Sequence, residues 1–200
     1  MTAARRARLV VLISGSGRTL MNLHDRIGRG TLNAEIVGVI ASRPCKGVDR
    51  AHAAGLDAEI LPGEIPAGTL VDRVDNLGAD LLVLAGYLRR VPVPDRLRRR
   101  VVNIHPALLP GDGTGGRFGG PGMYGMKVHR AVLESGVPES GCTVHFCDVG
   151  YDTGPIILQR RCPVLPGDTP ESLADRVFSL ELDAYPDALQ LLIARGGMAG

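Results

Sequence analysis

Short, almost continuously apolar runs alternate with helix-like stretches over the first half of this 200-residue chain. Runs without apolar–polar alternation are typical of strands buried on both faces of a parallel sheet. The stretches between them would form helices that cover both faces, as in doubly wound α/β folds. We expect strands at residues 9–14, 35–42, 58–62, 80–86 and 101–105, and helices near 18–29, 46–54, 68–77 and 88–99.

The pattern changes after residue 105. Residues 110–122 hold seven glycines and two prolines among 13 residues, a composition that predicts a loop. A helix near 125–135 follows, and then two strands, 142–149 and 155–165. The short Y-D-T-G between these two strands favours an antiparallel, hairpin-like return.

The C-terminal segment begins with strong helix signals. Asp168 or Thr169 serves as N-cap and Pro170 lies in the first turn, so a long helix is expected. The predicted fold is therefore α/β, with a doubly wound, mainly parallel, Rossmann-like sheet, an antiparallel C-terminal addition and a long C-terminal helix.

Composition narrows the function classes. The 44% hydrophobic content suits one domain, and a net charge of +2 with 23 basic and 21 acidic residues argues against nucleic acid. The basic run 95–100 lacks interleaved aromatics, so we interpret it as a solvated helix face. The apolar run behind the N-terminal arginines is too short for a signal peptide or a membrane span. We expect a cytoplasmic protein with no membrane partner.

The four cysteines form no C-x-x-C pair, and no histidine stands at zinc spacing. We interpret them as reduced, buried small hydrophobes and expect no metal site.

The loop after the first predicted strand reads S-G-S-G-R-T-L, residues 14–20. Small residues between a strand and a helix form a nest of N–H groups that favours an anion. Gly15 and Gly17 would let the backbone approach a phosphate, and Ser16, Arg18 and Thr19 would add donors. The segment matches neither the dinucleotide fingerprint nor a P-loop, and a tight turn without ligand is the alternative.

Two polar residues stand at the end of a buried strand in V-V-N-I-H-P. Side chains alternate along a strand, so Asn103 and His105 point to the same side. An amide N–H suits a developing oxyanion, and an imidazole can donate a second hydrogen bond or move a proton. The alternative is a pair of hydrogen-bonded polar residues that ends a strand.

A carboxylate completes the candidate set. Asp152 lies on a glycine-containing turn, where an aspartate usually serves local hydrogen bonds. If the hairpin folds back over the sheet end, Asp152 would orient His105 or stabilise its charge. Amide, imidazole and carboxylate suit acyl transfer, but no serine elbow or placed cysteine accompanies them, so the substrate would supply the nucleophile.

Over residues 8 to 196 the sequence resembles the glycinamide ribonucleotide transformylases of the formyltransferase superfamily. The resemblance rests on V-V-L-I-S-G-S-G-R-T-L, N-I-H-P-A-L-L-P, S-G-C-T-V-H-F, D-T-G-P-I-I-L-Q and the Y-P that follows Glu181. It implies transfer of a formyl group from 10-formyltetrahydrofolate to the amine of glycinamide ribonucleotide in purine biosynthesis.

The resemblance also implies residue roles. Asn103 and His105 would stabilise the oxyanion, and Asp152 would hold His105 charged and organise a proton-relaying water. Glu181 matches the acidic residue that holds the substrate ribose. The folate pocket would be formed by Leu88, Arg89, Arg90 and Val91 and by Asp148, Val149, Gly150 and Tyr151.

On this basis we expect a single formyltransferase domain over residues 1–200, with a phosphate-binding half at 1–100 and a catalytic, folate-binding half at 101–200. The formyl donor would be a cosubstrate, no metal would take part, and the protein would be a monomer or homodimer.

Three features depart from the family pattern. Gly17-Arg18-Thr19 replaces the usual phosphate-loop residues, and Arg18 would compensate by offering a charged donor. The loop 111–125 is longer than usual, and it is either a mobile cover or a surface insertion. The segment before Asp80 lacks a clear counterpart of an arginine that helps bind the folate tail.

Other activities remain as alternatives. A formyltransferase acting on another small phosphorylated amine and a non-catalytic folate- or nucleotide-binding module both fit parts of the pattern. A tRNA formyltransferase or a formyltetrahydrofolate hydrolase would carry a further domain, and a dinucleotide-binding protein would carry the glycine fingerprint.

Overall fold

The computed structural model describes residues 5–195 and divides them into two compact units. The first runs up to Val102 and also takes in the chain from Leu189 onward, and the second is Asn103–Ala188. The strand order is β3-β2-β1-β4-β5-β6-β7, and strand β5 (Val101–His105) passes from the first unit into the second. The functional division into two halves stays a prediction.

The first unit alternates strands with helices, as the apolar runs predict. Strand β1 pairs in parallel with β2 and with β4, and β2 pairs in parallel with β3. Nearly every side chain of β1 is buried, which explains its continuous apolar sequence. The elements are β1 (Ala7–Ile13), α1 (Arg18–Gly28), β2 (Ala34–Ala41), α2 (Lys46–Ala53), β3 (Ala58–Ile60), α3 (Ala67–Asn76) and β4 (Leu81–Leu84).

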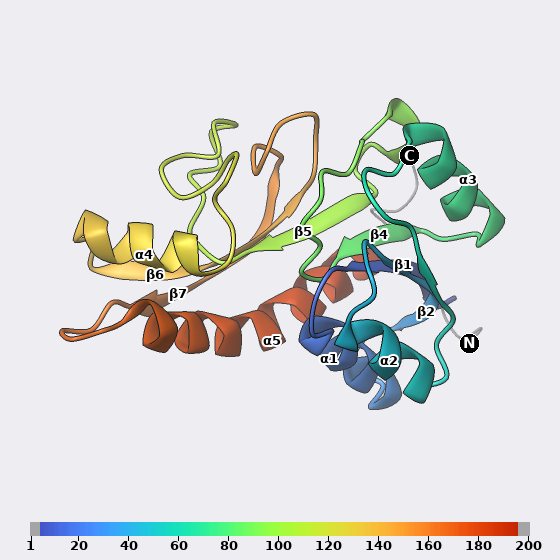
Figure 1. The fold of residues 1–200 in the computed structure, drawn as a ribbon, viewed down its shortest axis with the longest axis horizontal. Helices are drawn as coiled ribbons and strands as arrows, with labels where there is room; N and C mark the ends of the chain where they lie inside the picture. The colour runs from blue at the N-terminus through green and yellow to red at the C-terminus, as the bar shows by residue number, and fades with distance from the viewer. Residues whose placement is uncertain (1–4, 196–200) are drawn as a thin grey trace. The chain divides into compact units, whose positions relative to one another are not determined.

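The doubly wound arrangement follows from the direction of the chain. It moves outward from β1 through α1 and α2 to β3, and then returns through α3 to β4 on the other side of β1. Because such crossovers are right-handed, the reversal carries α3 to the opposite face of the sheet. Figure 1 shows α1 and α2 together on one side of these strands and α3 on the other. The predicted doubly wound fold is confirmed.

The helix expected near residues 88–99 is wrong. Only a short 3₁₀ turn, η1 (Asp95–Leu97), forms there. Pro92 and Pro94 explain the difference, because proline lacks the N–H of a helix interior and disfavours helical backbone in the residue before it. The segment after β4 is therefore an irregular loop rather than a helix.

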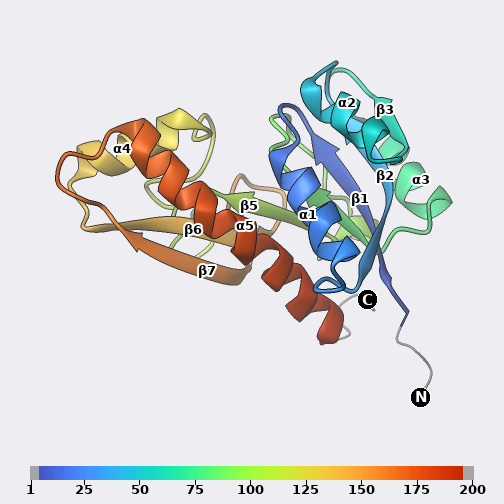
Figure 2. The same ribbon diagram turned by 90° about the horizontal axis from the view of Figure 1, so that it is seen from below.

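The second unit contains the predicted antiparallel addition. Strands β6 (Glu139–Phe146) and β7 (Ile156–Pro163) pair antiparallel, with Cys142 opposite Arg160. Figures 1 and 2 show α4 (Met126–Ser135) and the long helix α5 (Pro170–Ala194) on opposite sides of this pair.

The start of α5 confirms the predicted N-terminal signals. Thr169 Oγ1 accepts the Ser172 N–H at 3.2 Å, which caps the helix. Asp168 accepts hydrogen bonds from Arg176 at 2.6 and 2.8 Å and from Ser172 Oγ at 2.7 Å. Within residues 5–195, the helices are all too short or too polar to span a membrane.

Candidate active site

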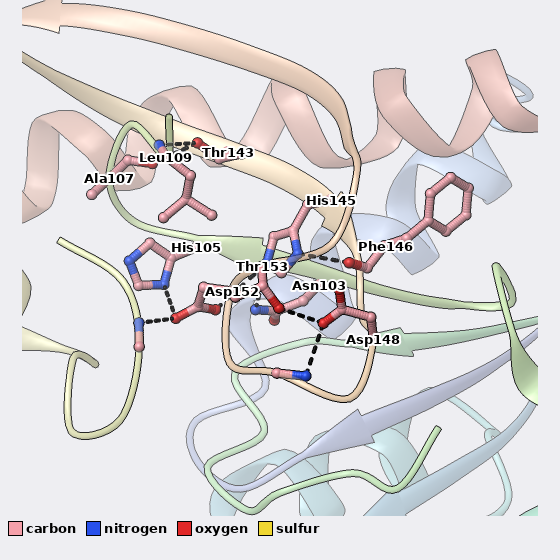
Figure 3. A network of polar contacts seen from close by, with 12 residues as sticks. Asn103, His105, Ala107, Leu109, Thr143, His145, Phe146, Asp148, Asp152 and Thr153 are labelled. Carbon is pink, nitrogen blue, oxygen red and sulfur yellow. Dashed lines mark hydrogen bonds and ion pairs between the residues drawn. The ribbon is translucent and has the colours of Figure 1, made fainter. Parts of the chain in front are cut away.

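Strand β5 places Asn103 and His105 on one side of the sheet, as their two-residue spacing predicts. Figure 3 shows both side chains directed toward Asp152, which lies on the turn between β6 and β7. His105 is only 3% exposed, although it lies at the end of its strand. The structure therefore brings together the three residues proposed for catalysis within the second unit.

The two ring nitrogens of His105 face different acceptors. Nε2 lies 2.7 Å from the carbonyl oxygen of Phe118, a short hydrogen bond that requires a proton on Nε2. Nδ1 lies 3.5 Å from Asp152 Oδ2. In the neutral ring, Nδ1 is therefore the nitrogen without a proton, and it becomes a second donor when the ring is protonated.

Asp152 is held by its surroundings on several sides. Its Oδ2 accepts the Gly120 N–H at 2.9 Å, and its backbone φ of 57° lies in the left-handed region that aspartate tolerates better than most residues. The turn is braced by Asp148 Oδ1, which accepts the Gly150 N–H at 3.0 Å and the Thr153 hydroxyl at 2.5 Å. An unusual backbone conformation at a polar site is a frequent mark of function.

The sequence interpretation missed His145. Its Nδ1 donates to the Phe146 carbonyl at 2.9 Å, so Nε2 of the neutral ring can accept from the Asn103 amide, 3.3 Å away. The same nitrogen lies 3.6 Å from Asp152 Oδ1. His145 is 1% exposed, so its buried neighbours rather than bulk water determine its tautomer. A signal was present, because Thr143 and His145 place two polar side chains on one face of a buried strand.

Burial governs the electrostatics of this network. It lowers the pKa of His105 below its ordinary value, more than Asp152 and the Phe118 carbonyl raise it. Burial also raises the pKa of Asp152, but the rings of His145 and His105 and the Gly120 N–H outweigh it, so the net pKa is lowered. Asp152 is therefore ionised at neutral pH, beside an imidazole that is mainly neutral when no substrate is bound.

The turn after β5 is held by a buried hydroxyl. Thr143 Oγ1 donates to the Ala107 carbonyl at 2.7 Å and accepts from the Leu109 N–H at 3.1 Å, as Figure 3 shows. Gln159 Nε2 adds hydrogen bonds to the same hydroxyl and to the Leu109 carbonyl. These contacts fix the chain that follows His105 and thereby limit the movement of its ring.

The predicted phosphate loop lies in the first unit, between β1 and α1. Three donors hold its carbonyls: Arg43 Nε on Ser14 at 2.9 Å, the Gly47 N–H on Gly15 at 3.0 Å, and Arg50 Nη1 on Ser16 at 2.8 Å. A trans peptide directs its N–H opposite to its carbonyl, so the following N–H groups point away from these donors. The loop therefore presents backbone N–H groups in the manner of an anion nest.

Gly17 ends this loop and precedes α1. Its φ of 74° is left-handed, and a Cβ on it would lie 2.7 Å from the Gly47 Cα. No side chain caps α1, and no acidic residue stands in its first turn. Arg18 is exposed and Thr19 half-buried at the first positions of the helix.

The residues predicted to bind folate fall in both units. In the first, the Leu88 N–H donates to Ser14 Oγ at 2.9 Å, which ties this segment to the phosphate loop, and the Leu88 side chain is 53% exposed. Arg89 and Arg90 are exposed and Val91 is half-buried. In the second unit, residues 148–151 form the turn that carries Asp152, with Val149 80% exposed.

Two more side chains bear on the prediction: Tyr87, which precedes the predicted folate segment, and Glu181, predicted to hold the ribose. The hydroxyl of Tyr87 is buried and has no hydrogen-bond partner among residues 5–195, and burial raises its pKa. Glu181 lies on α5. Burial of the Cys142 thiol, followed by the charge of Glu181, raises the pKa of Cys142 to about 12. Glu181 therefore lies within electrostatic reach of Cys142 on β6.

Comparison with known protein families shows the class of protein to which this chain belongs. A family model described as formyl transferase matches residues 7–189, and the chain belongs to that family.

More particular similarities accompany the family match. The chain is similar to the glycinamide ribonucleotide transformylase 1 of Symbiobacterium toebii, with 38% identity, 95% of this chain and 89% of that one covered, and a TM-score of 0.82. For the corresponding protein of Geobacillus kaustophilus the identity is 32%, the coverages are 94% and 99%, and the TM-score is 0.80. The expected resemblance to these transformylases is confirmed.

Longer relatives also match. The chain is 38% identical over 195 residues to the chloroplastic phosphoribosylglycinamide formyltransferase of Arabidopsis thaliana, which covers 92% of this chain but only 65% of the relative. It is 38% identical over 205 residues to the trifunctional purine biosynthetic protein adenosine-3 of Drosophila melanogaster, covering 96% of this chain and 14% of that protein. The chain thus spans less than two thirds of the length of these relatives.

Proposed function

We propose that this chain transfers the formyl group of 10-formyltetrahydrofolate to the amine of glycinamide ribonucleotide. The observation that carries the proposal is the convergence of Asn103, His105 and Asp152 in one network, with the Asp152 carboxylate only 12% exposed. Membership of the formyl transferase family and similarity to glycinamide ribonucleotide transformylases support the choice of substrates.

In this reaction the amine nitrogen of the substrate attacks the formyl carbon, and the carbonyl electrons move onto oxygen. The second N–H of the Asn103 amide, beyond the one directed at His145, donates to that oxygen. His105 acts through Nδ1, because Nε2 is engaged by Phe118. The amine proton passes to His105 Nδ1, and Asp152 stabilises the charge of the protonated ring. As the carbonyl re-forms and the bond from the formyl carbon to the folate nitrogen breaks, that nitrogen takes the proton from His105 and leaves as the neutral amine of the folate.

The amine itself serves as the nucleophile in this scheme. The thiol of Cys147 is influenced by the charge of Asp152. Burial, followed by the charges of Asp152 and Asp148, raises the pKa of this thiol. A thiol that stays protonated is a poor nucleophile. Direct attack by the substrate amine therefore needs no covalent enzyme intermediate.

The substrate phosphate is assigned to the N–H groups of residues 15–19 with Arg18, and the ribose to Glu181. The folate is assigned to residues 88–91 and 148–151, whose exposed apolar members Leu88 and Val149 suit a flat ring system. These binding roles rest on the family resemblance together with the exposure of the side chains.

The test is an absorbance assay of folate deformylation with 10-formyl-5,8-dideazafolate, with and without glycinamide ribonucleotide. We expect turnover that depends on the amine. Turnover without the amine would indicate a hydrolase instead. A folded protein that binds the folate but turns over neither mixture would favour another phosphorylated amine or a binding module.

A further inference from the structure

The glycine-rich loop that follows β5 contacts the network of Asn103, His105, His145 and Asp152 through two backbone groups. The Phe118 carbonyl accepts from His105 Nε2 at 2.7 Å, and the Gly120 N–H donates to Asp152 Oδ2 at 2.9 Å. A backbone acceptor at residue 118 thus binds the imidazole of His105, and a backbone donor two residues later binds the carboxylate of Asp152. Figure 3 shows this loop passing beside the side chains of His105 and Asp152.

Gly119, between these two residues, fits without room for a side chain. A Cβ on it would lie 2.5 Å from the Gly115 carbonyl oxygen, 2.8 Å from Leu109 Cδ2 and 3.1 Å from Asp152 Cβ. The first contact is with backbone, which cannot rotate away. Any side chain at this position must therefore displace the loop from His105 and Asp152.

We propose that Phe118–Gly120 is a positioning segment for catalysis, in which the Phe118 carbonyl fixes the His105 tautomer, the Gly120 N–H orients Asp152, and Gly119 permits both contacts. This inference rests on the proposed formyl transfer and assigns a function to part of the long loop. With Nε2 held as a donor to Phe118, Nδ1 is the ring edge left to exchange a proton. With Oδ2 shared between Gly120 and His105, the carboxylate stays aligned with that edge.

The charged and titratable groups around His105 leave the tautomer dependent on this segment. Asp152 faces the ring from the β6–β7 turn, His145 from β6 and His129 from α4. Asp152 attracts a proton to Nδ1, and the two histidines oppose added charge. The Phe118 carbonyl is the group that selects Nε2 for the proton of the neutral ring.

The variant that tests this proposal is Gly119→Ala, which alters the loop without replacing any of the side chains proposed for catalysis. Gly68→Ala is the matched control, because a Cβ there has no neighbour within 4 Å. In Gly119→Ala we expect kcat to fall on the order of 10- to 100-fold, since misplacement by about 1 Å can cost that much, while KM for the amine changes far less. Gly68→Ala should match the wild type.

The second measurement is the ring ¹⁵N spectrum of the histidines without substrates, with His105 assigned by its loss in His105→Gln. The wild type should show the Nε2–H tautomer at His105, and Gly119→Ala should show a mixture. A wild-type Nδ1–H tautomer overturns the proposal even if the variant fails to fold. Unchanged kcat, or a rise in KM alone, also overturns it.

The two measurements separate this proposal from the proposed function. Turnover of the wild type decides the formyl transfer, whereas the tautomer is measured without any substrate. Wild-type turnover with an unchanged Gly119→Ala would reject only the positioning role. An inactive wild type with an Nε2–H tautomer would reject the proposed substrates and retain the contact.

Discussion

The loops that follow β1 and β5 offer two different kinds of chemistry. After β1, donors from α2 and its preceding loop hold the carbonyls of residues 14–16, so the backbone presents N–H groups. After β5, side chains dominate, with Asn103 and His105 aligned by the strand and matched by Asp152. Small residues thus suit one strand end to bind an anion, and polar side chains suit the other to assist a reaction.

The comparison predicts that changes after β5 lower kcat, whereas changes after β1 raise KM for the phosphorylated substrate. A backbone site tolerates side-chain changes as long as the donors that hold its carbonyl oxygens remain. A side-chain site loses its function with a single donor. The following predictions are ordered by the size of their effects.

Asn103→Ala should lower kcat on the order of 10²- to 10³-fold, because removal of one oxyanion donor has this effect in comparable sites. Asn103→Asp keeps the size of the side chain but replaces the donor with acceptors, and it should be equally impaired. Steady-state kinetics at saturating folate and amine measures both. If Asn103→Asp retained wild-type kcat, the oxyanion role would be rejected.

His145→Leu should lower kcat about tenfold, because it leaves a half-buried Asn103 N–H without its acceptor, a loss worth about 1–3 kcal/mol. His145→Gln places an amide oxygen near the position of Nε2 and should recover much of the activity. The recovery separates positioning of Asn103 from a packing effect. Equal loss in both variants would argue for packing.

Arg18→Ala should raise KM for the phosphorylated amine by about five- to tenfold and leave kcat nearly unchanged, since a charged donor to phosphate acts on binding. Arg29→Ala, at the other end of α1, provides the charge-matched control. An unchanged KM in Arg18→Ala would remove Arg18 from the phosphate site and leave the backbone as its principal donor.

The smallest effect concerns stability rather than catalysis. The Arg176 guanidinium lowers the pKa of Asp168 below its ordinary value of 3.8. A lowered carboxyl pKa stabilises the fold above 3.8, and this contribution is lost as the pH falls through the folded-state pKa. Thermal unfolding of Asp168→Asn and wild type should therefore differ most at neutral pH, and the difference should shrink below pH 3.8. A constant difference would contradict the linkage.

Helices and strands with a local cause could be predicted from residue pattern alone. Continuous apolar runs predicted the buried strands β1, β2 and β4, and Thr169 with Pro170 predicted the start of α5. The helix expected at 88–99 was wrong because leucine and arginine favoured it while Pro92 and Pro94 prevented it. In that case two local signals competed, and the steric one prevailed.

Part of the candidate site could also be predicted from local sequence pattern. Alternation along a strand placed Asn103 and His105 on one side, and the short turn carrying Asp152 was recognisable between two apolar strands. The role of His145 was not predicted, because a lone histidine in a buried strand is usually part of the packed core. Its contact with Asn103 spans 42 positions of sequence and depends on how β5 and β6 are arranged.

By itself, the sequence determined the alternating architecture through residue type and short spacing, and its motifs predicted the family through their resemblance to known members. It also supplied the residues that we propose to assist acyl transfer. Only the tertiary structure decided which nitrogen of His105 is free, which groups hold Asp152 and how the glycine-rich loop meets them. The physical reason is that a tautomer or a carboxylate orientation is set by the partner atoms within hydrogen-bond reach. Here those partners are the backbone of Phe118 and Gly120, whose contacts are independent of their side chains.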